Sequence, residues 1–387
     1  TASEFMEYID THHGDELETY QKAWPDWWTD GFGSAARETA AIREAQTEMN
    51  VTTGLLAMST AFGEALKPGI FSDIDQIYRN ILFYDEHTFG AAESISQPYS
   101  ENSMVQWAEK SSYAWEALKE SRILREEAFG LLQEHIPRFS EPSITVFNTL
   151  NKTRSGLVSL YIDHEIIEPG STFSINYLDD KRVPVQSVSS RSDGTHWVLW
   201  VEDVPPMGYR SLIIKTGEGK KFLGTVEPFQ GKFENDHWSV ILDPETGSIS
   251  SLVDKARKKE VVDPDSKWKP GQLIYERLSN RRQLELYTLR EEPKRTSLTN
   301  VSFDKIERGS IWTAIHVQGF LEACSDVPVK IEYRFYNEKP LIEINYSLIK
   351  NPVVRPEALY VAFPFVEENG EIIFEAQGGA VRPGKDQ

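Results

Sequence analysis

The chain has 387 residues, of which 40% are hydrophobic, so it is long enough for two or three domains that each bury their own core. Sixty acidic residues against 41 basic ones give a net charge of −19, which repels nucleic acids and anionic lipids, so neither is expected as a partner. No apolar run approaches the roughly 20 residues that a membrane helix needs. The single cysteine, Cys324, excludes an internal disulfide framework.

The first helical pattern runs from Ser34 to about Gly63, where apolar residues recur at helical spacing. The apolar stripe consists of Ile42, Ala45, Met49, Leu56, Phe62 and Leu66. Lys67, Pro68 and Gly69 end the pattern, because proline cannot extend a helix and glycine supplies the turn.

Two further helices are predicted before the pattern changes. A short one fits residues 72–83, with Ser72 as N-cap and aspartates in the first turn, where the helix dipole favours negative charge. A long one fits residues 101–136 and ends at Pro137. Its apolar face would carry Met104, Ala108, Trp115, Leu118, Phe129, Leu132 and Ile136. Three helices with no strand pattern among them predict a three-helix bundle over residues 34–140.

After Pro142 the hydrophobic period changes to two. The runs rich in β-branched and aromatic residues are ITVFNTL, GLVSLYI, HWVLWVEDV, YRSLIIK, KIEYRFY and LIEINYSLI. In KIEYRFY, Ile331, Tyr333 and Phe335 would face one way and the charged residues between them the other, as in a half-buried antiparallel strand. The sequence DPETG at residues 243–247 predicts a tight turn.

Glycines at positions 217, 219 and 224 indicate a seam near residues 217–228. We therefore expect a small β-domain over residues 141–220 and a large β-sandwich domain over residues 221–387. The predicted fold class is α+β multidomain, a three-helix bundle followed by antiparallel β-sandwich domains.

The first candidate site is the segment WPDWWTDG at residues 24–31. Tryptophan rings and carboxylates that accept hydroxyl hydrogen bonds are what a sugar subsite requires, which makes Trp28 and Asp26 candidates. The same residues also fit a tryptophan-rich loop that packs against a helix start, with Asp30 as a cap. The spacing alone does not decide between the two.

The second candidate is YDEHTFG at residues 84–90, directly after the short helix. Its His87 and neighbouring carboxylates are of the types that ligate a divalent metal, but adjacent side chains diverge, so other ligands would have to come from elsewhere. A solvated polar loop is the competing interpretation. The His-x-Asp sequence His13-Gly14-Asp15 looks like a ligand pair, but its glycine and flanking acids predict an exposed turn.

Several stretches together resemble glycoside hydrolase family 38, the zinc-dependent retaining α-mannosidases. They are WPDWWTDGFGSAARETAAIREAQ, YDEHTFGA, ITVFNTLNKTRSGLV, VEDVPPMGYRSLII, FENDHWSVILDPETGSISSLVDK and RPEALYVAFPF. The pattern ENxxxxVxxDPxTGxIxSLxDK within the fifth is the most specific. The resemblance covers nearly the whole chain and agrees with the predicted order of helices before strands.

The resemblance implies that residues 1–33 are the tail end of a catalytic α/β barrel and that the large β-domain is incomplete. It implies zinc as cofactor, a mannoside as substrate, and two carboxylates that act in a retaining scheme. His87 would match the family's later zinc histidine, although an ungapped count places Asp85 there. Trp28 and Asp26 would contact the sugar, while the nucleophile would lie upstream, so this chain alone is expected to be inactive.

Two alternatives stay open. Lys22-Ala23 departs from the Gly-Asp that the family places before WPDWW, which fits an inactive carbohydrate-binding or scaffolding relative. A different glycosidase or lyase that shares only the β-sandwich is the other alternative. A homo-oligomer is compatible with the sequence, which does not decide the oligomeric state.

Overall fold

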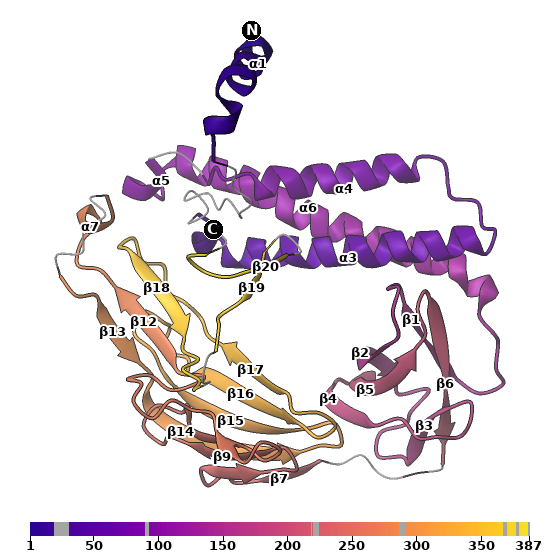
Figure 1. Ribbon diagram of the computed structural model, residues 1–387. Coiled ribbons are helices and arrows are strands. Elements are labelled where there is room, and N and C mark those ends of the chain that lie inside the picture. Colours follow the sequence, from indigo (N-terminus) through magenta and orange to yellow (C-terminus); the bar gives the residue numbers. More distant parts are fainter. Residues whose placement is uncertain are drawn as a thin grey trace.

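The computed structural model describes residues 1–18, 31–89, 93–217, 219, 224–285, 291–366, 370–376 and 379–385. Helices occupy the first third of the chain and antiparallel sheets the rest, as Figure 1 shows. The prediction of an α+β chain rich in antiparallel sheets is therefore confirmed. No helix among these residues is long and apolar enough to cross a membrane.

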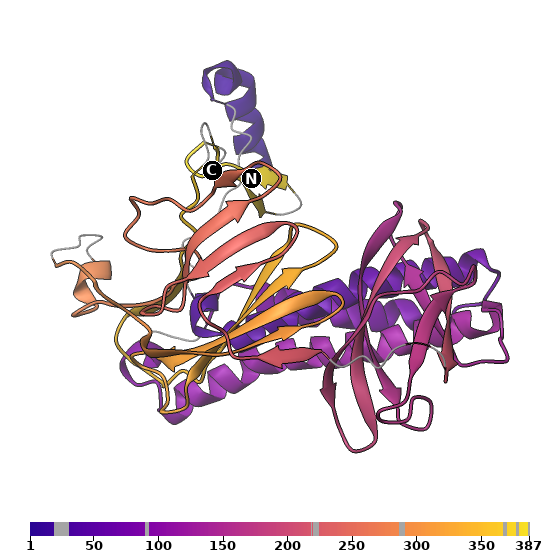
Figure 2. The ribbon, with the colours of Figure 1, turned by 90° about the horizontal axis from the view of Figure 1, so that it is seen from below.

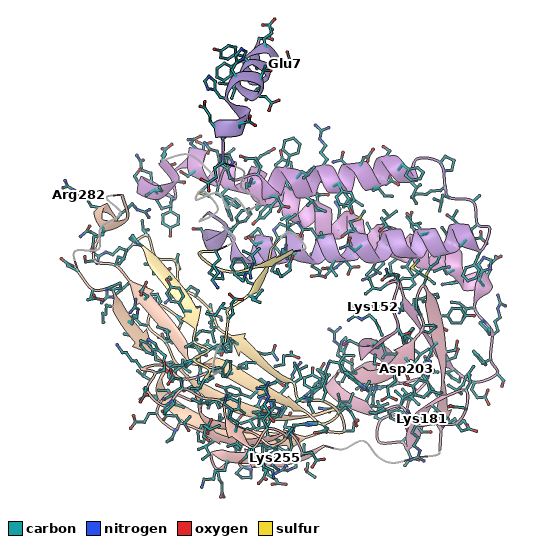
Figure 3. The ribbon with its side chains drawn as sticks, in the orientation of Figure 1. Glu7, Lys152, Lys181, Asp203, Lys255 and Arg282 are labelled. Atoms are coloured by element: carbon teal, nitrogen blue, oxygen red, sulfur yellow. The ribbon has the colours of Figure 1, made fainter. Side chains whose placement is uncertain are left out.

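Three long helices dominate the first part. They are α3 (Ala36–Ala61), α4 (Ile70–Asp85) and α6 (Glu101–Leu132). The shorter elements are α1 (Ala2–His13), α2 (Gly31–Ser34), α5 (Glu93–Ser96) and the 3₁₀ turns Gly14–Glu16 and Gln133–His135. The long helices share one buried core that includes Ile42, Met49, Ile77, Tyr84 and Leu132. The side chains of α1, where Figure 3 labels Glu7, are not buried.

Two helix details differ from the sequence prediction. Helix α4 begins at Ile70 rather than at Ser72, because Gly69 adopts a positive φ of 89° at the N-cap position and turns the chain into the helix without a side-chain cap. The N-terminal half of α6 turns a different face inward: Met104 and Trp115 are 57% and 41% exposed, and Ala108 is exposed too. The buried positions there are Ser103, Lys110, Ala114, Ala117 and Ser121.

The small side chains on this face let α6 pack closely against α3 and α4. The prediction for α6 followed large apolar residues, and it was wrong where the buried face is built from Ala and Ser. Leu118 and Leu132 are buried as predicted.

The first β-region consists of two three-stranded antiparallel sheets that share one core. One has the order β1 (Ser143–Asn148), β6 (Gly208–Thr216), β3 (Phe173–Tyr177), and the other β2 (Arg154–Asp163), β5 (Gly194–Val204), β4 (Val185–Ser190). It contacts the helices where Phe147 of β1 packs on Phe129 of α6, with ring centroids 5.8 Å apart.

The second β-region has three sheets around a common core. The five-stranded sheet runs β17 (Ile342–Ser347), β16 (Val329–Tyr336), β15 (Trp312–Phe320), β14 (Thr299–Arg308), β7 (Thr225–Glu227). The four-stranded sheet runs β11 (Lys259–Glu260), β10 (Ile249–Asp254), β9 (Trp238–Leu242), β8 (Lys232–Glu234). The three-stranded sheet runs β13 (Lys294–Ser297), β12 (Leu273–Arg277), β18 (Glu357–Val361). The remaining elements are α7 (Arg282–Glu285), β19 (Phe374–Ala376) and β20 (Gly379–Val381).

The alternation predicted for KIEYRFY is confirmed, since Ile331, Tyr333 and Phe335 are at most 1% exposed while the residues between them face outward. The predicted turn at residues 243–247 is also confirmed. It joins β9 to β10, with Gly247 at a φ of 70° and its N–H donating to the Asp243 carbonyl.

The two β-regions lie on the same side of the helices (Figures 1 and 2). Polar contacts of β4 join them: the Ser310 hydroxyl donates to the carbonyl oxygen of Val185, and Gln186 contributes its side chain. The chain leaves β6 at Thr216 and enters β7 at Thr225. The side-chain oxygen of Gln186 accepts hydrogen bonds from the backbone N–H groups of Ile311 and Trp312, at 3.0 and 3.1 Å. An apolar cluster that includes Trp200 of β5 and Trp312 of β15 surrounds this contact.

Replacing Gln186 by alanine would leave two N–H groups in this interface without their acceptor. We expect Gln186→Ala to lower the free energy of unfolding by about 1–3 kcal/mol. Urea denaturation followed by circular dichroism measures this as a lower midpoint. Gln230→Ala, at an exposed position, is the control and should leave the midpoint unchanged. Equal midpoints for both variants would contradict the assigned role of Gln186.

Candidate functional site

The candidate site is the segment that follows α4, residues 86–89, which we call the site loop. Helix α4 ends at Asp85, and Glu86 turns the backbone to an extended conformation with a ψ of 137°. The ammonium of Lys110, on α6, donates to the carbonyl oxygens of Phe83 and Glu86 at 3.0 and 2.5 Å. A cation in contact with the last carbonyls of a helix also interacts favourably with the helix dipole.

Lys110 is only 7% exposed, so its charge is held largely out of water. Its ammonium lies 4.7 Å from the ring centroid of Phe89 and 5.7 Å from that of Tyr84, and 3.6 Å from the Glu86 carboxylate. Desolvation lowers the pKa of Lys110, and the Glu86 carboxylate partly offsets this effect. Lys110 was not predicted from the sequence. The available signal was its helical spacing of seven from Ser103 and four from Ala114, both on the buried face.

Aromatic packing fixes both ends of the site loop. The hydroxyl of the buried Tyr84 lies 2.9 Å from the Thr39 hydroxyl of α3. The Phe89 ring packs edge-on against Phe32, with centroids 4.6 Å apart, and edge-on against Tyr84 at 5.7 Å. A Cβ at Gly31 would lie 2.6 Å from the Phe89 ring, so this position of α2 needs glycine for the close approach. The end of the tryptophan-rich segment thus contacts the site loop.

His87 lies on the site loop with its side chain 42% exposed, and its Nδ1 is 3.1 Å from a carboxylate oxygen of Glu86. Thr88 donates to the same carboxylate from its N–H at 3.0 Å and from its hydroxyl at 2.7 Å. Partial desolvation would raise the pKa of Glu86, but the Thr88 hydrogen bonds and the nearby Lys110 outweigh it, and the net shift is downward. Glu86 is therefore ionised at neutral pH.

Asp85, which the sequence offered as an alternative to His87 for the metal, has its carboxylate directed toward α3. Its carboxylate accepts a hydrogen bond from the Gln46 side chain of α3 at 2.9 Å. Desolvation by the surrounding helices raises the pKa of Asp85, and the Gln46 hydrogen bond opposes this shift. Although the residue as a whole is exposed, its carboxylate is less well hydrated than that of a free surface aspartate.

The described residues do not by themselves fit a zinc ion. No group of three or more His, Cys, Asp or Glu side chains among them could hold a metal. His87 can offer one imidazole nitrogen, whereas a zinc site needs at least three protein ligands. His13 belongs to a separate region at the end of α1, where its Nδ1 lies 3.2 Å from the Glu16 carboxylate and its side chain is 45% exposed. The predicted substrate-binding residues Trp28 and Asp26 lie outside the described residues.

The C-terminal part of the chain is similar to a known protein family. Residues 233–387 match the profile of the "Glycosyl hydrolases family 38 C-terminal domain". This part of the chain is a family 38 C-terminal domain. The resemblance to family 38 stated from the sequence motifs is therefore confirmed, and the DPETG hairpin between β9 and β10 lies inside the matched region.

Two solved structures from Enterococcus faecalis have a similar fold. One is a protein in the glycosyl hydrolase family 38, with 15% identity over 92% of this chain and a TM-score of 0.58. The other is an α-mannosidase from strain V583, with 14% identity over 89% of this chain and a TM-score of 0.58. This chain covers 47% and 45% of those proteins, about half of their length. A search of the curated proteins found no match.

We predict that Lys110→Met, which keeps a flexible side chain of similar length, destabilises the chain by about 1–3 kcal/mol, because two carbonyls at the end of α4 lose a charged donor. Amide hydrogen exchange should accelerate at residues 84–89, and thermal unfolding should shift downward. Lys119→Met is the control, since that side chain is 56% exposed and pairs with Glu116 on the same helix. Unchanged exchange in the site loop of the Lys110 variant would show that its ammonium does not hold the loop.

Asp85→Asn tests the electrostatics of the neighbouring helix end. The pKa of Asp85 is higher in the folded than in the unfolded chain, so ionising it costs stability once the pH rises above the unfolded value. The asparagine can still accept from Gln46, so we expect a small stabilisation at pH 7, below about 1 kcal/mol because the group is exposed. At pH 3, where both states are protonated, the difference should vanish. Thermal unfolding at both pH values measures it, and a variant less stable at pH 7 would contradict the prediction.

Proposed function

We propose that this chain is part of a zinc-dependent retaining glycoside hydrolase of the α-mannosidase type, acting on mannose-containing glycans. The observation that carries the proposal is the family 38 C-terminal domain at residues 233–387. The fold supports it, since it resembles that of an α-mannosidase over 89% of the chain. Because this chain covers less than half of that protein, the activity is proposed for a longer protein that contains it.

Within this proposal, His87 supplies one zinc ligand. Its Nδ1 faces the ionised Glu86 carboxylate, and in the tautomer with the proton on Nδ1, Nε2 carries the lone pair that a metal ligand needs. Lys110 and Thr88 hold the Glu86 backbone and carboxylate in place, so the orientation of the imidazole is indirectly fixed. The remaining ligands would come from outside the described residues.

Trp28 and Asp26 are proposed to bind the sugar, Trp28 by stacking and Asp26 by accepting hydroxyl hydrogen bonds. The contact between Gly31 and Phe89 supports this placement, because it brings the end of their segment against the site loop. A retaining mechanism needs a nucleophilic carboxylate and a second carboxylic acid. We assign neither role to a described residue.

The test uses the longer protein and an aryl α-mannoside. We expect hydrolysis that a chelator abolishes and added zinc restores. His87→Ala should lower the zinc content and reduce the activity at least about tenfold, as the loss of groups at a metal site does. Zinc per protein is measured by atomic spectroscopy, independently of activity.

His135→Ala is the matched control, because His135 is also a carboxylate-paired histidine of the helical part, 2.8 Å from Glu64. It should keep full zinc occupancy. Unchanged zinc content in the His87 variant would return His87 to a solvated loop residue. If the longer protein binds mannosides without hydrolysing them, the alternative of a carbohydrate-binding or scaffolding relative takes the place of this proposal.

A further inference from the structure

A small cavity lies on the sheet β13-β12-β18 of the second β-region. Figure 1 shows the position of this sheet. The cavity has a volume of about 270 Å³ and opens to solvent. The lining residues are Trp268, Ile274, Glu276, Arg295 and Tyr360. Sites for drug-sized ligands begin near roughly 300 Å³, so this cavity suits a smaller molecule.

The strand register explains why four of these side chains converge. Ile274 and Glu276 are two residues apart on β12 and therefore share one face of the sheet. Glu276 pairs directly with Arg295 on β13, and Ile274 pairs directly with Tyr360 on β18. Cross-strand partners point to the same face. The opposite face carries Tyr275, which is buried in the domain core.

Hydrogen bonds among the polar side chains of the cavity hold them in place before any ligand binds. The Arg295 guanidinium donates from Nε to Glu276 at 2.5 Å, and the Tyr360 hydroxyl donates to the other Glu276 oxygen at 3.4 Å. The Glu276 side chain is 14% exposed and that of Arg295 41% exposed, so the carboxylate is fixed while the guanidinium still reaches solvent. Desolvation and the adjacent Glu276 raise the pKa of Tyr360, so its hydroxyl keeps its proton.

The aromatic part is held by a rigid loop. Trp268 lies in the segment before β12, where the ammonium of Lys269 donates to the carbonyl oxygens of Asp263 and Ser266, both at 3.3 Å. The Lys269 N–H donates to the Gln272 side chain at 3.0 Å, which fixes the loop to the start of β12. Because the backbone beside Trp268 is held in this way, a ligand that contacts the ring has little of the loop left to order.

We propose that this cavity binds one neutral sugar residue, with Trp268 and Tyr360 contacting the apolar face of the ring and the Glu276–Arg295 pair bonding its hydroxyls. A pyranose presents both an apolar face and hydroxyls that donate and accept, which matches this lining. The carboxylate and guanidinium are paired with one another, so both can bond to the hydroxyls of a neutral ligand. The site is separate from the site loop and needs neither zinc nor hydrolysis.

The test measures binding of methyl α-mannopyranoside and methyl α-glucopyranoside to the 387-residue chain by saturation-transfer NMR, with a chelator present throughout. We expect a dissociation constant on the order of millimolar for a single small sugar. Trp268→Ala should weaken binding roughly tenfold. Glu276→Gln should also weaken it, because a neutral acceptor forms weaker hydrogen bonds than a carboxylate.

Trp115→Ala is the matched control. Trp115 on α6 is a partly exposed tryptophan with a cation, Arg37, 5.7 Å from its ring centroid, as Trp268 has Lys267 at 4.9 Å. Its loss should leave binding unchanged. The proposal would be overturned if the unsubstituted chain did not bind either sugar. It would also be overturned if the Trp268→Ala variant bound them as tightly as the unsubstituted chain. If circular dichroism shows that the Trp268→Ala protein is misfolded, Trp268→Phe and Glu276→Gln decide the outcome in its place.

The chelator removes any contribution from a zinc site at His87, and the loss of binding in Trp268→Ala and Glu276→Gln distinguishes this cavity from sugar binding at Trp28 and Asp26. Loss of hydrolysis in the longer protein would leave this cavity and its binding test untouched.

Discussion

The buried ammonium of Lys110 is the interaction on which the candidate site depends. It joins α6 to the carbonyl end of α4 and lies against the rings of Tyr84 and Phe89, so one charge holds a helix end and a loop at once. Burying a cation is costly unless donors and acceptors are matched. Here two carbonyls and one carboxylate supply the match. These contacts offset the free energy of desolvating the ammonium. An apolar residue at this position would leave the two carbonyl oxygens without this donor.

The same principle joins the two β-regions. Gln186 gives its side-chain oxygen to two backbone N–H groups of the neighbouring domain, in the middle of an apolar cluster. A directional contact of this kind fixes the relative orientation of two sheets more strictly than apolar packing alone, which tolerates sliding. In both places a polar side chain from one element satisfies the backbone of another, at a position where regular hydrogen bonding stops.

These two residues also mark the limit of what the sequence could predict. The alternation in KIEYRFY and the DPETG turn were predictable, because a period of two and a Pro-Gly turn are local properties of the chain. The buried face of α6 was not, since it is built from Ala, Ser and Lys, and the large residues Met104 and Trp115 face outward. The start of α4 was missed because the positive φ of Gly69 replaces a side-chain cap. The glycines near 217–228 predicted a seam, but the contact at Gln186 lies some 30 residues before them and carries no local signature.

For the candidate site, the sequence motif predicted the position of the site loop. It did not predict the side chains that fix the loop. The segment YDEHTFG drew attention to His87, while the structure shows that its Nδ1 lies beside the Glu86 carboxylate and that Thr88 and Lys110 contact Glu86. Lys110 is 23 residues further along the chain, and only tertiary packing brings it to the loop. Long-range partners of this kind are invisible to periodicity, which reports only which face of an element is apolar.

The two proposed sites differ in a way that follows from their construction. The cavity at Trp268 is formed by three paired strands and a loop whose backbone is fixed by Lys269, so every group it uses is present in this chain. The site at His87 is one-sided, because a single imidazole cannot satisfy a zinc ion and the described residues add no further ligand cluster. The sugar binding proposed for the β-region would therefore need this chain alone, while the zinc binding proposed at His87 would need ligands from outside the described residues. The two proposed sites share no side chain, so glycan binding at the cavity would be separate from a reaction at the site loop.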